Sequence, residues 1–220
     1  MEYKKLLRES GIVYRSTILP YIKSVWWLVV ILNILPYSYD YFGAIEASWL
    51  ELFLDGLREL NYSLLAMFGF VALLKSKDIN VELTSGKVVT YLFAMLFIGL
   101  ASLLGYMLLL IPGLIILSVS AFTALFIIYK DQGPIEAMAS STSHLGESWA
   151  RFTLLFSALW GVSALLEWFC LLVISNDTLS VIGMLLTGVL FDYFILCVVF
   201  NAYFALQKEI TNTEEIDIKV

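Results

Sequence analysis

The chain has 220 residues, of which 60% are hydrophobic and 15% are charged, whereas about 25% are charged in an ordinary soluble domain. This composition excludes a typical soluble globular protein and indicates an integral membrane protein. The formal net charge is −6, which gives no reason to expect a nucleic-acid partner. Acidic residues also influence membrane topology little.

Apolar stretches of spanning length recur along the chain. A bilayer core takes roughly 20 helical residues, so we predict an all-α polytopic domain over residues 1–207. It has six transmembrane helices arranged as three hairpins. Their expected ranges are 18–38, 48–75, 88–110, 114–130, 150–174 and 180–206. Residues 208–220 form a cytoplasmic acidic tail.

The second expected span begins with an amphipathic half, which either lies at the periplasmic interface or is shielded by neighbouring helices; we favour the interface. Between Ala44 and Leu60 charged and apolar side chains occupy opposite helical faces. The charged face holds Glu51, Asp55, Arg58 and Glu59, and the apolar face holds Trp49, Leu52 and Phe53.

The longest uncharged stretch runs from Val88 to Tyr129. It is long enough to cross a bilayer twice. Pro112 lacks a backbone donor and Gly113 tolerates a positive φ, so this pair is the expected turn. The stretch therefore predicts a transmembrane hairpin whose lysine-marked ends, Lys87 and Lys130, lie on the same side of the membrane.

The basic residues give an orientation for the six spans. Of the 13 lysines and arginines, only Arg58 falls on the other side of the membrane in this arrangement. Because positively charged loops stay in the cytoplasm, we expect both termini to be cytoplasmic.

The segment after Lys130 predicts an amphipathic cytoplasmic helix over residues 134–146. Pro134 suits the first helical position and Gly146 suits a C-cap, and Trp149 marks the inner boundary. His144 is the only histidine and has no second ligand nearby, so we expect no metal site. A Ser–His nucleophile pair is conceivable there, but no triad spacing accompanies it.

This region also carries a family resemblance. The pattern Leu108–Leu117 around Ile-Pro-Gly, followed by Gly133-Pro134-Ile135-Glu136-Ala137-Met138 and a serine-rich run to Trp149, resembles the YciC-like bacterial inner-membrane proteins. That family is related to the membrane portion of some glycerophosphodiester phosphodiesterases. The resemblance implies a six-span, all-helical protein without an established activity and with an envelope role.

Two acidic residues, Glu167 and Asp192, lie inside otherwise apolar spans. An ionisable group at that depth is costly unless it faces protein or water. Arg58 is a candidate counter-ion for Glu167. The three form either a polar pathway for protons or solutes, or a set of interhelical contacts that fix packing. Asn33, Asn61 and Asn201 are expected to hydrogen-bond between helices.

Three function classes remain. The first is a non-enzymatic inner-membrane protein of envelope homeostasis, without a cofactor. Its partners are membrane lipids, with a second copy or another membrane protein as further candidates. The second is a transporter or channel that uses Glu167 and Asp192. The third is an intramembrane enzyme acting on lipid. Both cysteines, Cys170 and Cys197, are expected to be free thiols because their spans place them too far apart to pair.

Overall fold

The computed structural model describes the backbone of residues 2–42, 48–173 and 177–217. Side chains are described for these residues except 29–42, 48–59, 61, 110, 167, 171, 177–182, 184, 185 and 210–217. Every regular element in the described part of the chain is helical, which confirms the all-α class. The elements are α1 (Tyr3–Phe42), α2 (Ser48–Lys75), α3 (Ser85–Leu108), α4 (Leu110–Val119), α5 (Thr123–Lys130), α6 (Pro134–Leu145), the 3₁₀ turn η1 (Gly146–Ser148), α7 (Trp149–Val173) and α8 (Asp177–Asp217).

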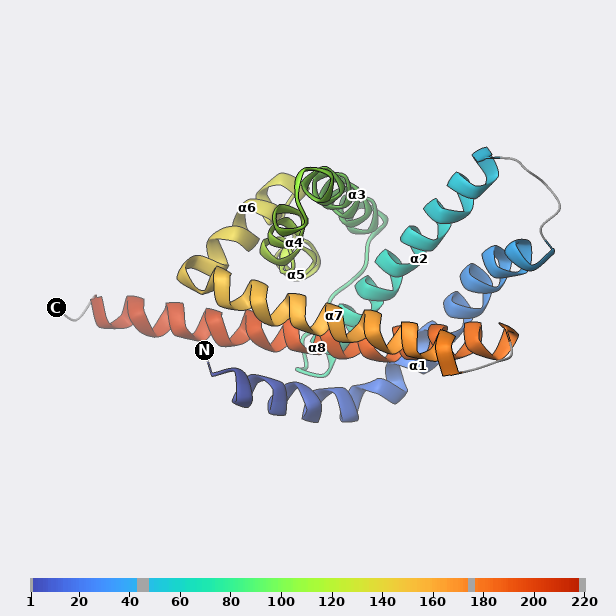
Figure 1. The fold of residues 1–220 in the computed structure, drawn as a ribbon. Helices are drawn as coiled ribbons and strands as arrows, with labels where there is room; N and C mark the ends of the chain where they lie inside the picture. Colours follow the sequence, from blue (N-terminus) through green and yellow to red (C-terminus); the bar gives the residue numbers. More distant parts are fainter. Residues whose placement is uncertain (1, 43–47, 174–176, 218–220) are drawn as a thin grey trace.

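Helices α7 and α8 run side by side, and the first half of α1 runs along α8 (Figure 1). Helices α3 and α4 pack together and are viewed almost end-on in the same picture. The two pairs therefore run in different directions (Figure 1).

The centre of the molecule is the middle of α8, residues 193–206. Helix α8 contacts α1, α2, α6 and α7. Tyr193, Phe200 and Tyr203 are among the largest fully buried side chains. Buried apolar residues surround this helix, so protein rather than lipid covers much of it. Its apolar character therefore reflects a protein core at least as much as membrane contact.

Polar contacts connect α1 to this central helix. The Asn201 amide donates to the Ser10 hydroxyl at 3.2 Å, which donates in turn to the Leu6 carbonyl at 2.8 Å. The rings of Tyr21 and Tyr193 stack, with 4.0 Å between their centroids. The expected interhelical role of Asn201 is confirmed, whereas the Asn33 and Asn61 side chains lie outside the described residues. Such contacts fix the register of helices in an apolar setting.

The turn between α3 and α4 lies at Leu109, not at Pro112–Gly113. Leu109 is extended (φ −163, ψ 148), and α4 begins at the next residue. Pro112 stands in the first turn of α4, where backbone N–H groups have no intrahelical partner, so a proline loses no bond there. The prediction was wrong because this proline marks the start of a helix and not the turn before it.

Gly113 and Gly105 let the two helices approach closely. A Cβ added at Gly105 would lie 2.8 Å from both the Cα and the backbone N of Gly113. A Cβ at Gly113 would lie 2.5 Å from the Tyr106 ring. Neither position has room for a side chain, so both glycines are required by packing.

The segment expected to form one helix over 114–130 is divided into α4 and α5. Turn residues Ser120–Phe122 separate them. The Phe122 amide donates to Ser141 Oγ of α6 at 3.1 Å, and Ser141 Oγ donates to the Val119 carbonyl at 2.6 Å. An interrupted helix needs such partners for its freed backbone groups when water is excluded. One buried serine on a neighbouring helix supplies both.

Four stretches among the described residues are long and apolar enough to cross a membrane. They are Ser85–Leu108, Ile111–Lys130, Pro134–Cys170 and Leu186–Glu209. Within the third, only α7 has spanning length, because α6 has just 12 residues. Tyr62–Lys75 is a shorter apolar helix. Side chains in the second half of the expected span 18–38, and in most of the first half of the expected span 48–75, are outside the described set.

Candidate functional site

Asp192 lies on α8, partly buried, where α7 passes beside it. Its Oδ1 accepts a hydrogen bond from the Ser163 hydroxyl of α7 at 3.4 Å. Ser163 is itself buried. The carboxyl group therefore contacts a polar partner across the α7–α8 interface, which is a contact that stabilises an acid in an apolar setting.

The other two members of the expected acidic site are placed only by their backbone. Glu167 follows Ser163 by about one turn of α7, and Arg58 lies on α2. Their side chains are outside the described residues. The structure thus places Glu167 on the helix that contacts Asp192, and a contact between Glu167 and Arg58 lies outside the described residues.

His144 lies on α6 inside an aromatic cluster that the sequence did not indicate. Its ring stacks on that of Tyr203, with 4.7 Å between the ring centroids. It packs edge-to-face with Phe122 and Phe126, with 5.6 Å between the centroids in each pair. Nε2 lies 3.0 Å from the Tyr203 carbonyl oxygen. Because a carbonyl only accepts, Nε2 carries the proton and the neutral ring keeps its lone pair on Nδ1.

An open pocket of about 440 Å³ adjoins this cluster, lined by Phe126, Ala139, Ser140, Ser143 and His144. Ser140 and Ser143 therefore line the same pocket as the imidazole. The Tyr203 carbonyl accepts a hydrogen bond from the ring, as the carboxylate of a catalytic triad does. No group of three metal-ligating side chains occurs within the described part of the chain.

Protonation of His144 is disfavoured by its surroundings. Burial lowers the pKa of His144, and the nearby Lys130 charge lowers it further, while the Tyr203 carbonyl opposes this. The folded protein therefore binds the proton less readily than the unfolded chain, whose histidine has a pKa near 6.5. The stabilisation contributed by the neutral ring is present above that pH and is lost as the pH falls toward the lowered pKa.

We predict that thermal stability in detergent declines between pH 7 and pH 5 and that His144→Phe removes this part of the decline. The variant keeps an aromatic ring in the cluster and cannot be protonated. Scanning calorimetry or a thiol-independent dye assay at the two pH values measures the effect. An equal decline in wild type and variant would show that other groups cause it.

Two lysines near the helix ends make specific contacts. The Lys77 ammonium lies 4.3 Å from the centre of the Phe204 ring and 5.5 Å from that of Phe200. Burial lowers the pKa of Lys77, which the nearby Glu9 charge opposes. Lys87 forms a salt bridge with Asp131, with 3.3 Å between Nζ and Oδ1. These contacts hold the α2–α3 loop against α8 and join the start of α3 to the end of α5.

The remaining connector residues have local structural positions. Pro134 opens α6, and Gly146 ends it with a positive φ of 45°. Trp149 is the first residue of α7 and is half-exposed. The cysteines Cys170 and Cys197 are free.

The described helices define an all-helical chain with four membrane-spanning candidates and two polar centres, one at Asp192 and one at His144. No protein-family model, curated protein or solved structure matches the chain.

Proposed function

We propose that the chain is a non-enzymatic integral protein of a bacterial inner membrane that acts in envelope homeostasis. In this proposal it spans the membrane six times, with both termini in the cytoplasm. Its support comes from the apolar surface of the helices, from the distribution of basic residues and from the YciC-like pattern around Pro112 and Pro134.

The observation that carries the membrane location is the outer surface of α3 and α7. Large apolar side chains on both helices are exposed along most of their length. Examples are Phe93, Leu96, Phe97, Leu100, Leu103, Leu104, Met107, Leu154, Leu165, Trp168, Phe169 and Leu172. Soluble monomers rarely expose apolar patches beyond a few hundred Å². Lipid covers such a surface without cost.

Alkaline extraction of membranes tests the location. We expect the protein to stay in the membrane pellet after carbonate treatment and to enter solution only with detergent. Release into the supernatant would contradict the proposal. The envelope role predicts that removing the gene from its host raises uptake of a normally excluded dye, and that expression of the intact chain restores exclusion.

A second function, proton-linked or small-solute transport, is favoured by the Asp192–Ser163 contact between α7 and α8. An acid held by a hydroxyl inside an apolar helix pair is typical of proton relays as well as of packing contacts. The divided helix α4–α5 adds support, since interrupted helices line the binding sites of many transporters.

Flux measurements separate these functions. If transport is the function, Asp192→Asn is expected to reduce proton flux into proteoliposomes at least about tenfold, because the amide cannot release a proton. Asp131→Asn is the matched control, since Asp131 is largely exposed and pairs with Lys87 outside the spans. Equal background flux in wild type and both variants would exclude this transport function and favour a packing role for Asp192.

A further inference from the structure

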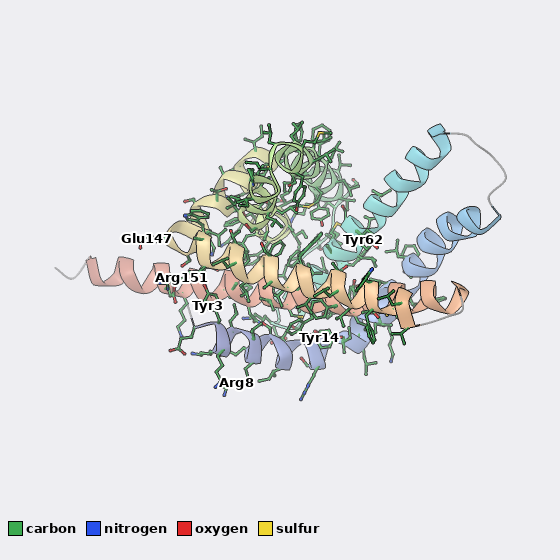
Figure 2. The ribbon with its side chains drawn as sticks, viewed as in Figure 1. Tyr3, Arg8, Tyr14, Tyr62, Glu147 and Arg151 are labelled. Carbon is green, nitrogen blue, oxygen red and sulfur yellow. The ribbon has the colours of Figure 1, made fainter. Side chains whose placement is uncertain are left out.

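The first half of α1 presents a stripe of basic side chains on its outer face. Lys4, Lys5, Arg8, Arg15 and Lys23 are all exposed. At 3.6 residues per turn they fall within an arc of about 100°. Figure 2 shows Arg8 pointing away from the rest of the molecule. We call these five residues the basic stripe.

The orientation of the stripe is fixed by the opposite face of the same helix. Leu6, Ser10 and Thr17 are buried, and Ser10 contacts the Cys197 carbonyl and the Asn201 amide of α8. The helix therefore cannot rotate its basic residues inward. The acidic Glu9 lies on the flank, where its charge acts on Lys77.

Apolar side chains alternate with the basic ones along the stripe. Ile12, Leu19 and Trp26 are 62%, 66% and 60% exposed and fall within the same arc. Tryptophan is enriched at the level of lipid headgroups. Basic residues interleaved with exposed apolar ones are typical of helices that contact a membrane surface, because phosphates attract the cations while the apolar groups enter the acyl boundary.

We propose that the basic stripe binds the phosphate groups of anionic phospholipids. The proposal rests on the membrane location proposed above and adds the class of lipid and the surface that selects it. An acidic protein surface would match the charges but would leave Ile12, Leu19 and Trp26 without the apolar environment that lipid provides.

A dye attached at the stripe reports its occupant. An environment-sensitive fluorophore on Ile12→Cys, in a Cys170→Ser background, labels one site, because Cys197 is buried. The full-length protein in detergent micelles is titrated with phosphatidylglycerol or with phosphatidylcholine. We expect a blue shift with phosphatidylglycerol alone, and we expect high salt to weaken it.

Charge removal gives the matched comparison. The triple variant Arg8→Gln, Arg15→Gln, Lys23→Gln is expected to need at least about tenfold more phosphatidylglycerol to reach half of the full blue shift. The control variant Lys75→Gln, Lys130→Gln, Lys208→Gln removes the same charge from exposed sites outside α1 and should respond like wild type.

Several results would overturn the proposal. They are an equal response to phosphatidylcholine, an equal loss in the control variant, or a stronger response to soluble polyglutamate than to lipid. A dye shift caused by deleting residues 208–220 would instead identify the acidic tail as the occupant. Alkaline extraction tests the membrane location without involving the basic stripe. If the protein stays in the pellet but its dye does not respond to phosphatidylglycerol, lipid binding by the stripe is contradicted and the membrane location is not.

Discussion

Replacing Gly105 with alanine is expected to force α3 and α4 apart and to lower the free energy of unfolding by about 1–3 kcal/mol. The added Cβ would lie 2.8 Å from backbone atoms of Gly113. Backbone cannot rotate away as the end of a long side chain can, so one of the helices must shift. Thermal or denaturant unfolding of the purified protein in detergent measures the loss.

Gly99→Ala is the matched control because Gly99 lies on the same helix and its added Cβ meets nothing within 4 Å. Alanine has the higher helix propensity, so this variant should be as stable as wild type or more stable by up to about 1 kcal/mol. Equal destabilisation at both positions would mean that the close approach of α3 and α4 is incorrect.

Ser141→Ala is expected to lower the free energy of unfolding by about 2–4 kcal/mol. The substitution leaves the Phe122 amide and the Val119 carbonyl without the hydroxyl that bonds to both. Each buried polar group left without a partner costs about 1–3 kcal/mol. Hydrogen exchange should also show faster exchange at Phe122, since its amide loses its acceptor.

Ser143→Ala controls for the loss of a serine from α6. Ser143 is exposed and lines the pocket beside His144, so its removal should change stability by no more than about 0.5 kcal/mol. If the Phe122 amide stays protected from hydrogen exchange in Ser141→Ala, then α6 does not stabilise the division between α4 and α5.

The all-helical, apolar character of the chain could be predicted from its composition and its long uncharged stretches. The ends of α6 could also be predicted, since Pro134 and Gly146 act through local backbone geometry. Asn201 was recognised as a contact residue because an amide inside an apolar span needs a partner. All of these depend on a residue and its immediate neighbours.

The division between α4 and α5 depends on Ser141, which is distant in the chain from Val119 and Phe122. Nothing in the local run distinguishes Ser120 from the other small residues around it. The His144 cluster likewise joins α5, α6 and α8. Contacts between distant segments are set by how helices pack, and periodicity alone does not contain them.

The candidate acidic site was predicted only at the level of residue type. The antiparallel order of the two helices allows Glu167 and Asp192 to approach each other, although their depths differ. A described partner of Asp192 is Ser163, one turn before Glu167 on α7. Because residues four apart lie on one helical face, the position of α7 along α8 decides which of the two side chains lies level with Asp192. The apolar sequence of α7 does not specify that position.

We propose above that the chain spans an inner membrane with both termini in the cytoplasm. This topology can be tested with a reporter that is active only in the periplasm. The reporter is fused after Gln207, at the end of the sixth expected span. We expect this periplasmic reporter to be inactive there and a cytoplasmic reporter at the same position to be active. An active periplasmic reporter after Gln207 would contradict it.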